Sequence, residues 1–107
     1  MKKCSVATIL VFLVLNASLF AAEGRFAGTV TDDMCGRKHT MMPGKPDSDC
    51  VRACVKAGRK HELVVGEKFY TLEGQSAEVD RLAAKQVRVT GDLAADVVHV
   101  ATIETAK

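Results

Sequence analysis

The sequence contains few aromatic residues and, beyond its first residues, no excess of either charge. Tryptophan is absent, and aromatic residues make up 5% of the 107 residues. After residue 22 the aromatics are Phe26, Phe69 and Tyr70, which are too few for a platform on which nucleobases stack. Because two of the 15 basic residues lie in the first three positions, residues 23–107 carry 13 basic and 13 acidic residues. Nucleic-acid binding depends on clustered Lys and Arg that neutralise phosphates, so we expect no nucleic-acid partner.

Recognisable catalytic motifs are also missing. The sequence shows no Ser, His and Asp arrangement, no phosphate-binding glycine loop and no internal repeat. Asp32 and Asp33 are adjacent carboxylates, but neighbouring residues that leave a strand point in different directions, so we expect both in a solvated turn. Cys50 and Cys54 do not form the Cys-x-x-Cys of thioredoxin-like enzymes. We therefore predict no catalytic residues and no enzymatic activity.

Residues 1–22 are typical of a secretory signal peptide. Two lysines precede the uncharged run VATILVFLVLNASLFAA, which ends in small residues at Ala22. The run is slightly short for a membrane-spanning helix and no basic cluster follows it, although a retained N-terminal anchor stays open. We expect cleavage near Ala21 or Ala22, which would discard Cys4. The mature chain is then periplasmic or secreted, without a membrane contact, and we expect a monomer with an unknown partner.

Hydrophobic patterns predict five strands and two helices in the mature chain. Segments with β-branched residues or alternating polarity, bounded by turn residues, predict strands over residues 25–32, 63–65, 68–73, 86–93 and 96–104. Gly66 and Glu67 form the turn of a hairpin between the second and third strands. Helical spacing predicts helices over residues 47–57 and 76–85, with Val79, Leu82 and Ala83 buried in the second. The predicted caps are Asp47 or Ser48 and Ser76.

This order of elements predicts an OB-fold-like barrel. Five strands with a helix between the third and fourth are typical of that small, partly open barrel. About 85 residues suffice for one modest core, so we predict a single, mainly β domain with two short helices over residues 23–107. A Cys/His-containing loop-helix insertion then lies between strands 1 and 2, a connection that flanks the binding face of OB-folds. An α+β sheet of another topology stays open.

The insertion contains most of the residues that could form a disulfide or bind a metal. Its sequence is DDMCGRKHTMMPGKPDSDCVRAC, and it holds every cysteine beyond the signal segment. Cys50, Ala53, Cys54 and Ala57 recur at helical spacing, so both thiols are expected on one buried face. Two further histidines have simpler explanations. We expect one, His61, beside the C-terminus of the first helix, where a cation is favourable, and the other, His99, facing solvent in the last strand.

Three stretches, VTDDMCGRKHTMM, CVRACVKAG and LVVGEKFYTLEG, make the mature chain resemble a known group of proteins. It is a family of small exported bacterial domains of unknown function that is frequent in acidobacteria. Its members have a Met-Cys-Gly-x-x-His segment, a Cys-x-x-x-Cys-Val helix and a V-x-V-T-G strand. The matching residues are Met34, Cys35, Gly36, His39, Cys50, Cys54, Val55, Gly58, Gly74 and the VRVTG of residues 87–91. The resemblance implies an exported OB-like or related β domain and implies no activity.

A disulfide is one use of the cysteines. Nearby cysteines pair in oxidising compartments, and Cys35 joined to Cys50 or Cys54 would tie the loop to the helix in a non-enzymatic interaction module. Cys50 and Cys54 are an awkward pair within a regular helix. A thiol–disulfide redox role is another use, because Cys50 lies in the first turn of its helix and a third cysteine is near.

A metal site is the remaining use. Three Cys and one His are a ligand set of closed tetrahedral zinc sites, and the predicted ligands are Cys35, His39, Cys50 and Cys54. Thioethers suit copper(I), and the additional soft ligands are Met34, Met41 and Met42. The spacing matches no zinc-finger motif, so zinc and copper both stay open. A disulfide explains neither the third cysteine nor the histidine, and we therefore favour a metal-binding accessory domain.

Overall fold

The computed structural model describes residues 22–38 and 42–106. The predicted signal segment up to residue 21, His39 and Met41 lie outside the described residues. The elements are β1 (Ala22–Asp32), α1 (Asp47–Lys56), β2 (His61–Val65), β3 (Lys68–Glu73), α2 (Ser76–Arg81), β4 (Gln86–Ala94) and β5 (Val97–Thr105). The prediction of a mainly β chain with five strands and two short helices is confirmed. Within these described ranges, no helix is long and apolar enough to cross a membrane.

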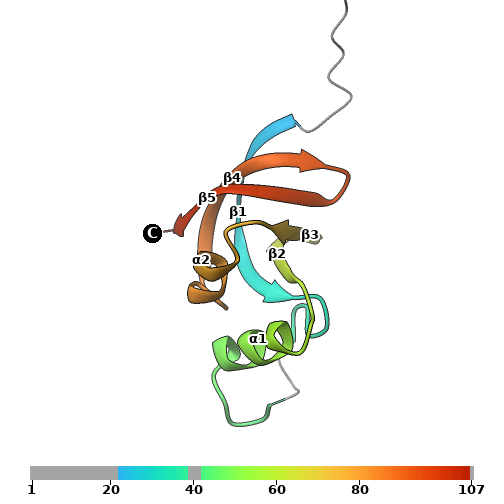
Figure 1. Cartoon of the computed structure of the whole chain (residues 1–107). Helices are drawn as coiled ribbons and strands as arrows, with labels where there is room; N and C mark the ends of the chain where they lie inside the picture. Colours follow the sequence, from blue (N-terminus) through green and yellow to red (C-terminus); the bar gives the residue numbers. More distant parts are fainter. Residues whose placement is uncertain (1–21, 39–41, 107) are drawn as a thin grey trace, which may run out of the picture.

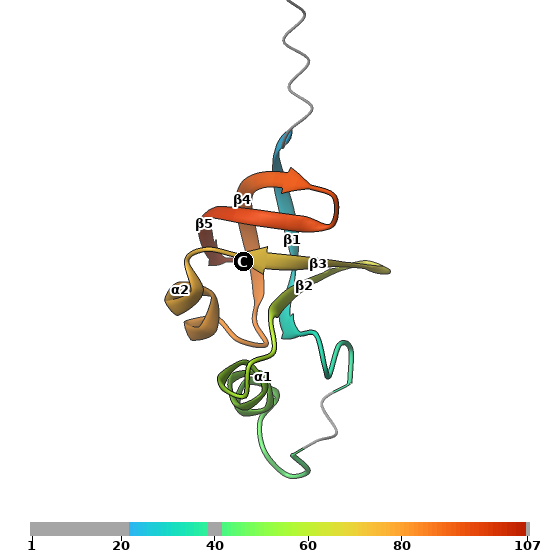
Figure 2. The same cartoon turned by 45° about the vertical axis from the view of Figure 1, so that its right-hand side comes forward.

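The five strands form one mixed sheet that closes into a ring in the order β1-β2-β3-β5-β4 (Figures 1 and 2). Neighbouring strands are antiparallel except β3 and β5, which are parallel. β1 pairs with two neighbours, because Ala22 to Thr29 pair with β4 and Thr29 to Asp32 pair with β2. The ring therefore closes through the bend in β1.

Glycines allow the strands to approach one another at two points of this ring. A Cβ atom at Gly28 in β1 would lie 2.1 Å from the carbonyl oxygen of Val64 in β2. A Cβ atom at Gly91 in β4 would lie 2.1 Å from the carbonyl oxygen of His99 in β5, next to a register shift between Thr90 and Gly91. Only a residue without a side chain fits such a close approach of two backbones.

The hydrophobic core fills the ring, and α2 contributes to it from one end (Figure 1). Its members are Val30, Leu63, Leu72, Val79, Leu82, Val87, Val89, Val98 and Val100. The predicted buried residues of the second helix are confirmed, since Val79, Leu82 and Ala83 are at most 2% exposed. α2 is shorter than predicted and ends at Arg81. Ala84 has a φ of +64°, and its N–H donates to the Val30 carbonyl, which turns the chain toward β4.

α1 lies outside the ring, in the connection between β1 and β2 (Figure 1). The predicted caps are wrong for both helices, because no side chain of the described residues caps either N-terminus. Pro46 occupies the N-cap position of α1, and Gln75, in a left-handed conformation, occupies that of α2. Asp47 and Ser76 are instead the first helical residues.

The buried face of α1 is Cys50, Val51 and Cys54. The predicted face included Ala53 and Ala57, but both of these residues are exposed. Compared with the predicted face, the buried face is shifted around the helix toward Val51, which has no exposed area. Arg52 attaches α1 to α2, because its guanidinium donates to the carbonyls of Asp80 and Arg81, both at 3.1 Å. These carbonyls lie at the C-terminal end of α2, where a cation is favourable.

Candidate metal centre

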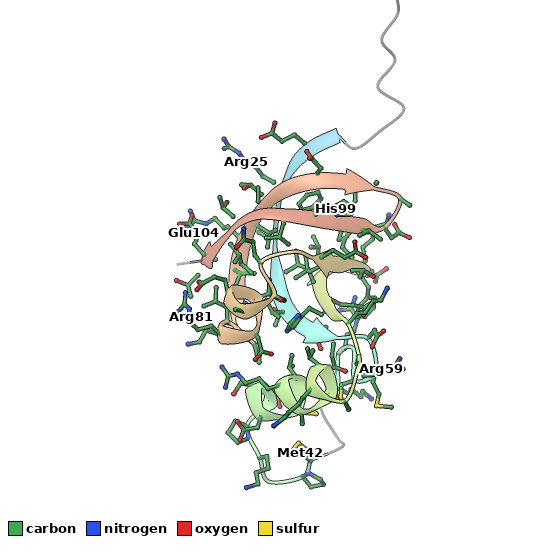
Figure 3. The ribbon with its side chains drawn as sticks, viewed as in Figure 1. Arg25, Met42, Arg59, Arg81, His99 and Glu104 are labelled. Atoms are coloured by element: carbon green, nitrogen blue, oxygen red, sulfur yellow. The ribbon has the colours of Figure 1, made fainter. Side chains whose placement is uncertain are left out.

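Three sulfur atoms meet where the turn after β1 touches α1. The Sγ atom of Cys35 lies 3.2 Å from that of Cys50 and 3.6 Å from that of Cys54, and all three lie within 4.8 Å of one another. Cys50 is 1% and Cys54 is 9% exposed, and Cys35 is half-buried. Sulfur atoms gather at this end of the molecule, where Met42 also lies (Figure 3). The predicted convergence of the three cysteines on one point is therefore present.

The backbone turn that presents Cys35 is built by Asp32. Its Oδ2 atom accepts hydrogen bonds from the N–H groups of Met34 and Cys35, both at 2.9 Å. The carbonyl of Asp32 accepts the N–H of Gly36 at 3.0 Å, and Gly36 has a φ of +57°. Thr31 donates its hydroxyl to the Gly36 carbonyl at 2.6 Å. This short, closed turn directs Cys35 back toward α1.

Helix α1 supplies the other two thiols at positions one helical turn apart. Residues at i and i+4 lie on the same face of a helix, so Cys50 and Cys54 both face the Cys35 turn. Val51, between them in sequence, is fully buried and holds the helix against the rest of the domain. The two thiols are therefore positioned by the packing of α1 and not by a bond between them.

The sulfur spacing suits a shared metal ion. In a tetrahedral zinc site with bonds of about 2.3 Å, neighbouring sulfurs are about 3.8 Å apart. The Cys35–Cys50 and Cys35–Cys54 sulfur separations, 3.2 and 3.6 Å, are shorter than this by about 0.6 and 0.2 Å. A disulfide needs sulfurs about 2.05 Å apart, and none of the described cysteines is bonded to another. Small displacements of the side chains would place all three sulfurs around one ion.

Two thiols of this cluster, Cys35 and Cys54, hold their protons more strongly than an exposed thiol when no metal is bound. Loss of solvation raises the pKa of the Cys35 thiol well above its ordinary 9.0, and the neighbouring thiols and the charge of Asp32 raise it further. Loss of solvation also raises the pKa of Cys54, where the charge of Asp32 acts in the same direction although a hydrogen bond with Cys35 opposes it. Because a thiolate is the nucleophile and the metal ligand, an ion must displace these protons.

These raised pKa values predict how the stability of the metal-free protein depends on pH. In the unfolded chain Cys35 and Cys54 release their protons near pH 9.0, whereas in the folded protein both keep them to higher pH. Stability is therefore complete below pH 9 and falls as the pH rises above it. Urea denaturation at pH 7, 9 and 10, in reducing buffer with a chelator, measures the effect. Cys35→Ala should show a shallower decline than the unchanged protein, and equal declines in the two would contradict the assignment.

Asp32 is the main residue whose role the sequence analysis missed. It was expected in a solvated turn, but it has no exposed area. Its Oδ1 atom is buried and has no hydrogen-bond partner among the described residues. Asp33 next to it is the solvated one, paired with Arg59 at 2.8 Å. An Asp that bonds backbone N–H groups two residues on is a known turn motif, and that pattern was the available signal.

The other predicted ligands are His39, Met34, Met41 and Met42, and the described part of the chain does not test them. His39 and Met41 lie outside the described residues. Met34 is 54% exposed, and Met42 is partly buried. Their roles as ligands stay predictions.

The two remaining histidines differ from each other. His61 is 6% exposed, begins β2 and places Nε2 3.2 Å from Asp80 Oδ1, so the contact that the structure shows is with α2, and its expected interaction with the end of the first helix stays a prediction. His61 connects β2 to α2, and Asp80 also provides a carbonyl to Arg52. His99 is exposed as predicted, 3.6 Å from a carboxylate oxygen of Glu73.

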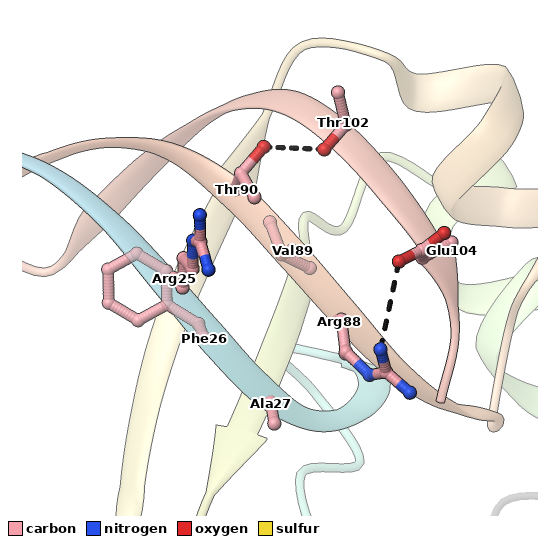
Figure 4. Close-up of a pocket in the computed structure, with 8 residues that line it drawn as sticks. All are labelled: Arg25, Phe26, Ala27, Arg88, Val89, Thr90, Thr102 and Glu104. Carbon is pink, nitrogen blue, oxygen red and sulfur yellow. Dashed lines mark hydrogen bonds and ion pairs between the residues drawn. The ribbon is translucent and has the colours of Figure 1, made fainter. Parts of the chain in front are cut away.

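A pocket on the outer surface of the sheet is separate from the cysteine cluster and shares no residue with it. It is lined by Arg25, Phe26, Ala27, Arg88, Val89, Thr90, Thr102 and Glu104, from β1, β4 and β5 (Figure 4). Arg88 approaches Glu104 at 4.0 Å, and Thr90 hydrogen-bonds Thr102 across the strands. Arg88 and Glu104 therefore pair with each other rather than remaining free for a ligand. No cysteine or histidine lines the pocket. The cysteine cluster remains the site with distinctive chemistry.

Comparisons with protein-family models, with curated proteins and with solved structures found no significant match. The resemblance to small exported acidobacterial domains stays a prediction. What this chain does is therefore inferred from its own geometry.

Proposed function

We propose that this protein is an exported, OB-fold-like domain that binds one zinc or copper ion through its cysteine cluster and acts as a non-enzymatic, metal-binding accessory protein. The observation that carries the proposal is the approach of three sulfurs to within 4.8 Å of one another. Three thiolates are a common part of structural zinc sites and also suit copper(I).

The fold supports this location for a binding site. The ring order β1-β2-β3-β5-β4, with α2 between β3 and β4, is compatible with an OB-fold-like barrel. The cysteine cluster then lies in the β1–β2 connection, beside the surface that OB-folds use for binding. A periplasmic or secreted location, which the signal-like N-terminus favours, and a monomeric state belong to the same proposal.

The chemistry of the thiols favours a metal over redox exchange. Reactive cysteines have lowered pKa values in electropositive surroundings, whereas the pKa values of Cys35 and Cys54 are raised, chiefly by loss of solvation. Asp32 also adds negative charge beside them. A metal ion provides the positive charge that makes thiolates stable there.

A disulfide staple between Cys35 and Cys50 is the second candidate, because their sulfurs lie 3.2 Å apart, nearer than the 3.6 Å between those of Cys35 and Cys54. In that case the protein is an interaction module that leaves Cys54 free. The two candidates differ in how many thiols remain reduced, which a count can measure.

The test is the composition of the protein purified from an oxidising compartment. Metal content per chain is measured by plasma mass spectrometry, and free thiols are counted by alkylation and intact mass after denaturation with a chelator. We expect close to one zinc or copper ion and three alkylated thiols among residues 23–107. One alkylated thiol without metal would contradict the proposal and support the staple.

A further inference from the structure

The carboxylate of Asp32 is buried at the cysteine cluster without a balancing charge. It has no exposed area, and Oδ1 has no hydrogen-bond partner in the part of the chain that the structure describes. A buried polar atom without a partner is costly, and a buried charge more so. Such an atom calls for an explanation, and an ion that binds there provides one.

The carboxylate is also held in place beside the cluster. Oδ2 accepts the N–H groups of Met34 and Cys35, at 2.9 Å each, so the side chain is fixed to the turn that presents Cys35. The charge of Asp32 acts on the thiols of both Cys35 and Cys54, and raises the pKa of each. Oδ1 is therefore the free oxygen of a carboxylate that is fixed to the turn presenting Cys35, and it lies just outside the group of sulfurs within 4.8 Å of one another, so the side chain must shift to reach a shared ion.

Nearby charged groups do not neutralise Asp32. Arg59 pairs with Asp33 instead, at 2.8 Å, and Asp33 also accepts the backbone N–H of Lys60 at 3.3 Å. Glu62, on β2, adds another acid: burial raises its pKa first, and the charges of Asp33 and Asp32 raise it further. Within residues 22–38 and 42–106, no cationic side chain pairs with Asp32. The site is therefore built to receive a cation.

We propose that Oδ1 of Asp32 is the fourth ligand of the metal site, which makes it a Cys₃Asp site that selects a divalent ion of the zinc type over copper(I). This inference rests on the proposed function. Three thiolates and a carboxylate are the donors, and carboxylate oxygen is an accepted zinc ligand but a poor one for soft copper(I). A divalent ion also neutralises more of this buried negative charge than a monovalent ion does. When the ion binds, the thiols release their protons to solvent.

The variant Asp32→Asn tests the carboxylate. Asparagine has nearly the same shape and keeps an oxygen for the N–H groups of Met34 and Cys35, but it lacks the charge. In competition with chelators of known affinity, the full chain should lose about a hundredfold to a thousandfold in zinc affinity, more than the roughly 10–100-fold that is typical when only a supporting outer-shell group is lost. Its copper(I) affinity should change by less than about threefold, since thiolates dominate copper(I) binding. Asp33→Asn is the matched control, because the neighbouring carboxylate is exposed, and it should leave both affinities unchanged.

The outcomes separate this inference from the proposed function. If the unchanged protein binds neither ion, the metal-binding proposal itself is wrong. If it binds zinc and Asp32→Asn binds zinc equally well, or if both ions lose affinity equally, the fourth-ligand assignment is wrong while the metal site stands.

X-ray absorption of the zinc-loaded unchanged protein gives a test that needs no variant. A Cys₃Asp site predicts three sulfurs at about 2.3 Å and one oxygen at about 2.0–2.2 Å from the ion. An outer-shell imidazole signal would instead identify a histidine ligand such as His39 and overturn the assignment. This measurement also covers the case in which Asp32→Asn does not fold.

Discussion

Replacing Cys50 with serine should lower the affinity for zinc by about a hundredfold to a thousandfold. Cys50 is 1% exposed and its sulfur lies 3.2 Å from that of Cys35, so the variant exchanges a thiolate at the centre of the cluster for a weak hydroxyl ligand. Structural zinc sites bind with about 10–16 kcal/mol, so one of four ligands accounts for about 3–4 kcal/mol. Each tenfold change in affinity is about 1.4 kcal/mol. Competition with a chromophoric chelator measures the loss.

The matched control for this variant is Ala53→Ser. Ala53 lies in the same helix but is exposed, so it receives the same hydroxyl without touching the cluster and should bind zinc normally. Circular dichroism of the metal-free variants checks that α1 is still folded. Unchanged zinc binding by a folded Cys50→Ser would exclude the cluster as the metal site, and equal losses in both variants would attribute the effect to the helix.

Replacing Gly28 with alanine should destabilise the fold by about 2–4 kcal/mol, at the upper end of overpacking substitutions. The added Cβ would lie 2.1 Å from the Val64 carbonyl oxygen and 2.9 Å from its carbonyl carbon. These are backbone atoms of a paired strand, so neither can move without opening the β1–β2 pairing. Urea denaturation of the metal-free protein measures the change in the free energy of unfolding.

The control for the strand substitution is Gly24→Ala, an identical change in β1. Its Cβ would meet the far end of the Phe26 ring at 2.9 Å, and a ring can rotate away where a backbone cannot. We expect a loss below about 1 kcal/mol there, as for ordinary surface changes. If the two variants lose equal stability, the close approach of β1 to β2 is not the reason that position 28 is glycine.

Features that depend on neighbouring residues were predicted well from the sequence. Alternating polarity, or β-branched residues between turn signals, identified each strand, although β1 and β2 begin a few residues earlier than predicted. Gly66 identified the hairpin turn between β2 and β3. Helical spacing identified α1 and the buried side of α2. The insertion of α1 between the first two strands followed from the order of these segments. Periodicity reports which side of an element is buried, and that information is local.

Most contacts between distant segments were not predicted, and the approach of Cys35 to Cys50 and Cys54 is the exception. His61 is buried with Asp80, which is distant in the sequence, beside it. Hydrophobic periodicity does not predict a partner in another segment. Ala53 and Ala57 are exposed because α1 is oriented by the burial of Val51 and by the hydrogen bond from Arg52 to the Asp80 carbonyl. The helix caps were wrong because the backbone before each helix, and not a side chain, determines where it begins.

The sequence by itself determined the five strands, the two helices and the thiol-bearing insertion, because these depend on residue type and local spacing. Only the tertiary structure decided how closely Cys35 approaches Cys50 and Cys54, and that Asp32 is buried in the turn that presents Cys35. The reason is that the turn after β1 and the face of α1 are brought together by packing. A sulfur or a carboxylate acquires its protonation and its metal chemistry from the groups that packing places around it.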